Sequence, residues 1–351
     1  MEAQPDQLPI MRLAAGGCLS RALAMAARLG IADIMDGGHI PYRDLAARTA
    51  SDPDVLLTLM QVLALGGVVE RDGEGAFAMS EAFAALRSDH PRSLRNFCIL
   101  VAETYDDAFG ALPHTVRTGK SAFHNVFGTS LYEYLERDPE TGRIFDSAMS
   151  ELARPVAAAL TEHYDFSSVN TVVDVGGGDG TTLAGILGGH AHLTGVCVDR
   201  ASVCARAKET VRAPAEQGVA RRITFRPADI FEEVPAGGER YLLKNVLHDW
   251  SPETCVRLLT TVGRAMRLTA EMREPGAAPP RLLVVEPLLD HESDAGHMLS
   301  QLVMCGKGSG GYGERELRLL LQRSGLTPVH VERLAGVHHL YECVLDADRH
   351  A

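Results

Sequence analysis

The stretch Thr171-Val-Val-Asp-Val-Gly-Gly-Gly-Asp-Gly180 runs from five strand-forming residues into four glycines and an aspartate. Its apolar run predicts a parallel strand buried on both faces, and residues 181–187 predict the helix that follows. Glycines let a backbone turn sharply and approach a ligand where a Cβ would collide. The stretch therefore predicts the first strand and the ligand-binding turn of an α/β fold.

The spacing of these glycines narrows the class of ligand. A dinucleotide-binding loop has the pattern Gly-x-Gly-x-x-Gly, but counting from Gly176 puts Thr181 at its last position, and counting from Gly178 puts Leu183 there. The next apolar run ends in Asp199, which is placed to accept hydrogen bonds from a ribose diol. A site for one ribose, without a loop that binds a pyrophosphate, predicts a ligand in which adenosine is joined to a group other than a phosphate.

Four ordered motifs carry a family resemblance. The segment Val173–Gly180 resembles the first motif of the class I S-adenosylmethionine-dependent methyltransferases. More narrowly, it resembles the small-molecule O-methyltransferases, such as plant caffeic acid O-methyltransferase and the bacterial enzymes that tailor aromatic natural products. The similarity continues, in family order and spacing, through Ala228–Phe231, Leu242–Trp250 and Val284–Pro287. It implies S-adenosylmethionine as cofactor and S-adenosylhomocysteine as product.

The predicted elements indicate two domains, 1–105 and 106–351. Helices and a hairpin around Asp72-Gly73 predict an N-terminal, mostly α-helical, winged-helix-like domain. The second domain begins with a helical connector rich in aromatic residues, where a flat acceptor would bind, and then alternates strands with helices as a doubly wound, Rossmann-like sheet. The resemblance implies seven strands in this α/β methyltransferase sheet, and a homodimer through the N-terminal domain. The alternative is that the opening helix packs only within its own chain.

Composition and charge argue against several classes of partner. The chain of 351 residues is 46% hydrophobic and 23% charged, which is typical of a soluble globular protein, and its net charge of −12 disfavours nucleic acid and anionic membranes. The winged-helix-like segment 36–95 carries nine acidic residues against six arginines, so it would repel phosphates. Seven scattered cysteines without a Cys-x-x-Cys pattern, and no basic leader or apolar span, predict a cytoplasmic protein with reduced thiols and no metal site.

Polar residues follow every predicted parallel strand, at the edge where an open α/β sheet binds its ligand. The resemblance implies that residues in and around these strand ends bind the cofactor. They are Asp174, Gly176, Gly178, Asp199, Arg200, Asp229, Ile230 and Lys244. Because a carboxylate accepts hydrogen bonds, Asp199 would accept them from the ribose hydroxyls and Asp229 from the adenine amine. The structural alternatives are a helix cap for Asp199 and a turn residue for Asp229.

His248 is the predicted general base. A phenol is mostly protonated at neutral pH, and its oxygen attacks a methyl group better as it loses its proton, so a histidine positioned against it is useful. A buried-strand run, residues 242–247, delivers His248 to the ligand edge. The resemblance implies that Glu286 holds the imidazole, and Asp249 either supports the site or caps the next helix.

One segment departs from the family pattern. Relatives carry Glu-Arg-Thr before the last helix, whereas this chain has Gly311-Tyr312-Gly313, so the second glutamate expected beside the histidine is absent. Glu314 is a candidate substitute. The glycine-rich run 306–313 predicts a flexible rim over the acceptor pocket.

The function predicted from these residues is methyl transfer from S-adenosylmethionine to a hydroxyl of an aromatic, antibiotic-type metabolite. The resemblance places five residues at the acceptor: Phe145, Met149, Trp250, Met298 and Met304. Two alternatives stay open, namely a cofactor-binding relative with non-methylating chemistry on a similar polycyclic substrate, and a winged-helix DNA-binding regulator.

Overall fold

The computed structural model describes residues 8–210, 217–289, 295–307 and 311–346, and the chain divides into two compact units. The first unit consists of residues 1–107 and 140–151, and the second of residues 108–139 and 152–351. Among the described residues, no helix is long and apolar enough to cross a membrane.

The first unit combines short helices with a small antiparallel sheet of order β1-β3-β2. The expected hairpin at Asp72-Gly73 forms, because the Asp72 carboxylate accepts hydrogen bonds from the backbone N–H groups of Glu74 and Ala76 at 2.9 and 2.8 Å. The elements are α1 (Leu8–Ala14), α2 (Gly16–Arg28), α3 (Ile31–Met35), β1 (Ile40–Pro41), α4 (Tyr42–Arg48), α5 (Pro53–Leu65), β2 (Val69–Arg71), β3 (Ala76–Met79), η1 (Glu81–Leu86), α6 (Arg95–Leu100) and η2 (Val101–Tyr105).

The connector is helical, as the sequence predicted. Its elements are α7 (Asp106–Phe109), α8 (Leu112–Thr118), α9 (Ala122–Phe127), α10 (Leu131–Arg137) and α11 (Pro139–His163). Helix α10 begins at a capping box, in which the Ser130 side chain accepts the Glu133 N–H and the Glu133 carboxylate accepts the Ser130 N–H. The N-terminal half of α11 belongs to the first unit and the rest to the second.

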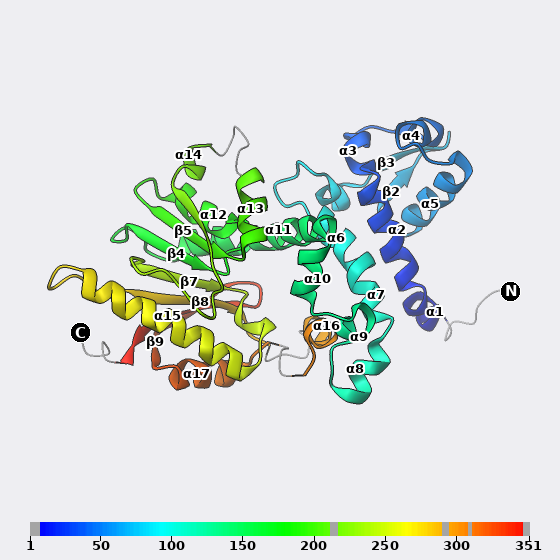
Figure 1. Cartoon of the computed structure of the whole chain (residues 1–351). Helices are drawn as coiled ribbons and strands as arrows, with labels where there is room; N and C mark the ends of the chain where they lie inside the picture. The colour runs from blue at the N-terminus through cyan, green and yellow to red at the C-terminus, as the bar shows by residue number, and fades with distance from the viewer. Residues whose placement is uncertain (1–7, 211–216, 290–294, 308–310, 347–351) are drawn as a thin grey trace. The chain divides into compact units, whose positions relative to one another are not determined.

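A seven-stranded sheet organises the second unit, in the order β6-β5-β4-β7-β8-β10-β9 (Figure 1). The first five strands are parallel, and β10 enters antiparallel between β8 and β9. The strands are β4 (Thr171–Val175), β5 (Thr194–Asp199), β6 (Ile223–Pro227), β7 (Arg240–Lys244), β8 (Arg281–Pro287), β9 (Leu326–Ala335) and β10 (His338–Leu345). The predicted doubly wound, seven-stranded architecture is confirmed.

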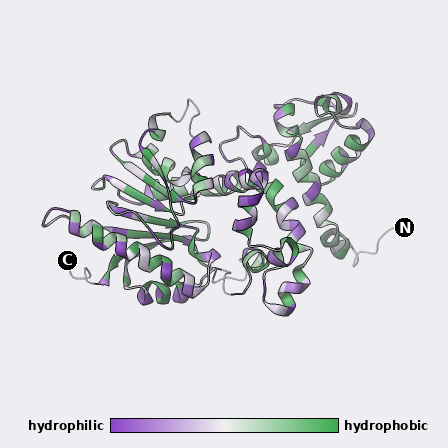
Figure 2. Cartoon of the chain, viewed as in Figure 1, coloured by the Kyte–Doolittle hydropathy of each residue, from purple (hydrophilic) through white to green (hydrophobic). Residues whose placement is uncertain are grey.

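Helices cover both faces of this sheet because alternate residues of each strand point to opposite sides. Val172 and Leu242 belong to one apolar cluster, which includes residues of α12, while Val173 and Tyr241 belong to a second cluster with α15 and α17. Figure 2 shows hydrophobic colour along most of these strands. The helices are α12 (Thr181–Gly189), α13 (Ala201–Thr210), α14 (Gln217–Ala220), η4 (Leu247–Asp249), α15 (Pro252–Met272), α16 (Ala295–Cys305) and α17 (Glu314–Arg323).

The buried hydroxyl of Tyr241 forms hydrogen bonds beneath α15. We expect Tyr241→Phe to lower the free energy of unfolding by about 1–2 kcal/mol. Its fully buried hydroxyl lies 2.6 Å from Thr269 Oγ1 and 3.1 Å from the Pro235 carbonyl oxygen. Urea unfolding measures the change. The control is Tyr42→Phe, because the Tyr42 hydroxyl has no hydrogen bond within the described ranges; an equal effect of both substitutions would contradict the assignment.

Candidate active site

The glycine loop after β4 is held against the end of β5. Gly176 and Gly178 have φ angles of 71° and 61°, a left-handed conformation that a side chain would strain. The Gly176 N–H donates to the Val198 carbonyl oxygen at 2.8 Å, and a Cβ added to Gly177 would lie 2.7 Å from Cys197 Sγ. The loop is therefore a tight turn that presents backbone at the sheet edge.

Asp199 ties this loop to the next strand. Its Oδ2 accepts the Gly178 N–H at 2.9 Å and its Oδ1 accepts the Arg200 N–H at 2.7 Å. The side chain is mostly buried, and burial raises the pKa of its carboxyl. The observed contacts are with the loop and the following residue. Each oxygen has a second lone pair to offer a ligand.

Asp174 has an unsatisfied carboxylate oxygen beside the same loop. Its Oδ2 is buried and has no hydrogen-bond partner among the described residues, and a Cβ on Gly177 would lie 2.8 Å from it. Burial raises the pKa of Asp174 to about 7, against the opposing effect of Lys244, whose own pKa burial lowers. A buried acceptor without a donor is costly, so a ligand with an N–H or ammonium group fits here.

Two other residues expected at the cofactor, Asp229 and Arg200, have protein partners. Asp229 is exposed, and its Oδ1 accepts the Phe231 N–H at 3.0 Å, as the turn alternative predicts. The Arg200 guanidinium donates to the Tyr132 carbonyl oxygen at 3.1 Å and pairs with Glu136. Arg200 therefore fastens α10 to the end of β5, a role that the sequence did not suggest.

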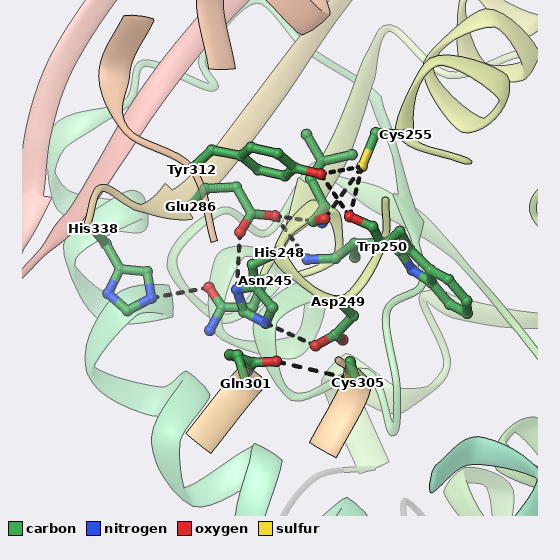
Figure 3. A network of polar contacts seen from close by, with 12 residues as sticks. Asn245, His248, Asp249, Trp250, Cys255, Glu286, Gln301, Cys305, Tyr312 and His338 are labelled. Atoms are coloured by element: carbon green, nitrogen blue, oxygen red, sulfur yellow. Dashed lines mark hydrogen bonds and ion pairs between the residues drawn. The ribbon is translucent and has the colours of Figure 1, made fainter. Parts of the chain in front are cut away.

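His248 lies in η4, directly after β7, between two carboxylates (Figure 3). Its Nδ1 is 3.1 Å from Glu286 Oε2, close enough for an ion pair though not in ideal hydrogen-bond alignment, and its Nε2 is 3.4 Å from Asp249 Oδ1. The other Glu286 oxygen accepts the N–H groups of Val246 and Leu247 at 2.8 and 2.7 Å. Glu286 therefore holds both the ring and the turn that carries it.

The neighbouring charges determine the protonation states of His248 and Glu286. Burial alone would lower the pKa of His248, but Asp249 and Glu286 outweigh it and raise that pKa to about 9. Burial would raise the pKa of Glu286, but His248 and the two backbone N–H groups keep it below its ordinary value. The ligand-free site therefore favours an imidazolium next to a carboxylate.

Asp249 lies beside His248 and does not cap α15. The cap is Ser251, whose side chain accepts the Thr254 N–H. The Tyr132 hydroxyl donates to Asp249 Oδ2, and the Tyr132 ring stacks on Trp250 with 5.6 Å between centroids. Among the described residues, Asp249 is thus the second carboxylate beside the histidine.

The segment that departs from the family pattern has a packing role. Gly311 has φ 80°, and a Cβ there would lie 2.2 Å from Leu289 Cδ1. The buried Tyr312 hydroxyl donates to the Trp250 carbonyl oxygen at 2.5 Å, as Figure 3 shows. The Glu314 carboxylate pairs with Arg318 on its own helix. Residues 308–310 of the expected flexible rim lie outside the described residues.

Sequence reasoning gave no role to His338, on β10. Its Nε2 lies 2.9 Å from Asn245 Oδ1, and Asn245 has φ 56°, a left-handed conformation uncommon for a residue other than glycine (Figure 3). Asn245 stands between Lys244 and the Val246 N–H that Glu286 accepts. Burial lowers the pKa of His338 to about 4, so it is a neutral donor at neutral pH.

We expect His338→Ala to lower the turnover rate on the order of 10-fold, because a relaxed Asn245 turn would displace His248. The affinity for S-adenosylhomocysteine, measured by calorimetry, should stay within about 2-fold. His338→Gln, which keeps a donor, should restore most of the rate. His339→Ala is the control on the same strand, and a rate loss there equal to that of His338→Ala would refute the positioning role.

A cavity of about 830 Å³ lies beside η4 in the second unit. Two of the predicted acceptor residues, Trp250 and Met304, line it, together with Asp249. Met298 lies on α16 but is not among its lining residues. Phe145 and Met149 belong to the first unit, so their predicted contact with the acceptor stays a prediction. The described residues contain no group of three or more side chains arranged to hold a metal ion.

Comparison with known proteins identifies two family domains in the chain. The model of the O-methyltransferase domain matches residues 109–327, and that of the O-methyltransferase dimerisation domain matches residues 11–86. O-demethylpuromycin-O-methyltransferase from Streptomyces alboniger is 36% identical over 93% of this chain and 86% of its own. Aclacinomycin 10-hydroxylase RdmB from Streptomyces purpurascens is 34% identical over 76% of this chain and 68% of its own.

Solved structures of related proteins have the same fold as this chain. That of LaPhzM superposes with a TM-score of 0.88 at 31% identity, covering 97% of this chain and all of that one. NcsB1 from neocarzinostatin biosynthesis, in complex with S-adenosylmethionine and 2-hydroxy-5-methyl naphthoic acid, gives a TM-score of 0.74 at 27% identity, over 93% of this chain and 95% of that one. The predicted family resemblance and the S-adenosylmethionine cofactor are confirmed.

Proposed function

We propose that this chain, which belongs to the S-adenosylmethionine-dependent O-methyltransferase family, methylates a hydroxyl oxygen of an aromatic, antibiotic-type metabolite with His248 as general base. The observation that carries the proposal is the position of His248 between Glu286 and Asp249. The glycine loop and Asp199 lie on the neighbouring strand ends of the same sheet edge. The aromatic acceptor is supported by the naphthoic acid bound to NcsB1.

The cofactor would bind over the carboxyl ends of β4 and β5. Asp199 would accept the ribose hydroxyls, and the unsatisfied Asp174 oxygen would accept an ammonium donor, with Lys244 as its counter-charge. Gly176 and Gly178 keep the surface of the loop free of side chains. When bound, the cofactor supplies an electrophilic methyl group on a sulfonium. The protein's contribution is alignment and exclusion of water.

Proton removal falls to Nε2 of His248, the ring nitrogen that does not face Glu286. As the imidazole takes the acceptor's proton, Glu286 and Asp249 stabilise the imidazolium. Only the neutral ring is a base, so the rate should increase as the pH rises toward 9.

The test is incubation with S-adenosylmethionine and a panel of hydroxylated aromatics, followed by mass spectrometry. A product that has gained one methyl group on oxygen, with one equivalent of S-adenosylhomocysteine, supports the proposal. In a parallel incubation with dioxygen and a thiol reductant, a product that has gained oxygen instead would favour the non-methylating alternative, which the relative named as a hydroxylase keeps open.

We also propose a cytoplasmic homodimer that binds neither nucleic acid nor membrane. The first unit exposes several large apolar side chains, among them Leu13 at 85% and Leu65 at 91% exposure. Such a surface calls for a partner, and the family's dimerisation domain covers residues 11–86.

The double variant Leu13→Arg, Leu65→Arg should weaken the dimer by at least about 100-fold, because burying one leucine contributes about 1.5–3 kcal/mol. Sedimentation equilibrium measures the dissociation constant. Leu319→Arg, at an exposed position on α17 in the second unit, is the control. A wild-type monomer, or a double variant as dimeric as wild type, would refute this interface.

A further inference from the structure

We infer that the acceptor carries a carboxylate, which Lys120 and Lys307 bind in the cavity that Asp249 and Trp250 line. The inference deepens the proposed function and rests on it. The volume of about 830 Å³ suits an aromatic small molecule of several rings. Its hydroxyl would lie toward Asp249, the neighbour of His248, and its acid group at the lysines.

The tertiary structure brings these two lysines together. The chain has only four lysines, and Lys120 and Lys307 lie far apart in sequence. The Lys307 N–H donates to the Gly119 carbonyl oxygen at 2.7 Å, and a Cβ on Gly119 would lie 3.5 Å from Lys307 Cδ. The Lys307 stem thus lies over the residue that precedes Lys120.

This arrangement is held in place from α16. The Ser121 hydroxyl donates to the Met304 carbonyl oxygen at 2.6 Å, and it also accepts the His124 N–H as the cap of α9. A Cβ on Gly306 would lie 2.9 Å from the Ser121 backbone nitrogen, so the two segments are in close contact. The backbone segments that carry Lys120 and Lys307 are therefore fixed against each other at the side of the cavity.

Within the described ranges, neither lysine has a carboxylate partner, although the cavity contains two acids. Glu133 accepts hydrogen bonds from the Thr129 hydroxyl and from Ser130, which lower its pKa to about 2. Asp249 is engaged by Tyr132 and His248. The acids thus have partners other than the lysines, while Lys120 and Lys307 are both exposed on neighbouring segments that line the cavity.

An anion that binds on this side of the cavity would interact with both positive charges. A carboxylate accepts charge-assisted hydrogen bonds from both. Trp250 and Met304 offer apolar contact to the aromatic body of the same molecule. An aromatic acid therefore satisfies the polar and the apolar parts of the cavity, whereas a neutral acceptor leaves the lysines unpaired.

The experiment compares matched acid and amide pairs whose hydroxyl and acid groups lie at opposite ends, such as 6-hydroxy-2-naphthoic acid and 6-hydroxy-2-naphthamide, together with 4-hydroxybenzoic acid and its amide. Calorimetry on the protein saturated with S-adenosylhomocysteine should show the acids binding about 10- to 100-fold more tightly than the amides, with the preference reduced at high salt. The Lys120→Gln, Lys307→Gln double variant should lose that preference and keep its affinity for S-adenosylhomocysteine.

Lys208→Gln is the matched control, because Lys208 lies on α13 and does not line the cavity. Equal affinity for acid and amide, no binding of any acid, or a preference that survives in the double variant would overturn the inference. Methylation of neutral hydroxylated aromatics by wild type and double variant alike would leave the proposed function standing while the acid site fails.

Discussion

His248→Ala should lower the rate of methyl transfer by about 10³-fold, while the affinity for S-adenosylhomocysteine changes by less than about 2-fold. The proposed base would act on the acceptor hydroxyl, whereas most of the predicted cofactor residues lie at the carboxyl ends of β4, β5 and β6. Product formation under saturating cofactor gives the rate, and calorimetry gives the affinity. The two measurements separate proton removal from binding.

The pH profile sharpens this expectation. Asp249 and Glu286 raise the pKa of His248 to about 9, so in the ligand-free state the ring loses its proton only as the pH approaches that value. Wild-type turnover should therefore climb between pH 7 and 9, and the residual rate of His248→Ala should lack that limb. His192→Ala is the control. A variant that keeps the wild-type profile would exclude His248 as the base.

Asp199→Ala should weaken binding of S-adenosylhomocysteine by at least about 100-fold, because it would remove a charged acceptor from the proposed ribose site and each such hydrogen bond contributes about 1.5–3 kcal/mol. It also removes the acceptor of the Gly178 N–H, so the loop loses one of its ties. Titration calorimetry measures the affinity.

Asp199→Asn separates these two effects. Its amide oxygen still accepts from one neighbour, so the loop should stay closer to its native conformation, while the charge is lost. We expect its affinity to fall between those of wild type and Asp199→Ala, with little change in thermal unfolding of the ligand-free chain. Unchanged binding in Asp199→Ala would remove Asp199 from the cofactor site and leave it a structural tie.

Much of the site was predictable because parallel strands end at one edge. Strand β7 delivers His248 and the adjacent β8 delivers Glu286, so the spacing of two apolar runs was enough to expect the two side chains near each other. The glycine loop was predictable for a similar reason, since a buried apolar run followed by glycines is typical of a parallel strand that ends in a tight turn.

The rest of the site depends on contacts between segments far apart in the sequence, which no local sequence pattern predicts. The pairing of Asp249 with Tyr132 joins η4 to a helix of the connector, and nothing in either segment specifies the other. The hydrogen bond of His338 to Asn245 exists because β10 runs antiparallel beside β8, which places His338 opposite Pro287. The lysine pair likewise arises from the contact between the end of α16 and the α8–α9 turn.

The insertion of β10 between β8 and β9 also has a consequence for synthesis on the ribosome. Until residues 338–345 have emerged, β8 is an open edge strand whose unpaired N–H and C=O groups can bind other chains. Glu286 lies on that edge, and Asn245 still lacks His338. The nascent chain must therefore carry an unfinished sheet until its last strand, β10, has been translated, and a translational pause before residue 338 would prolong its exposure to aggregation.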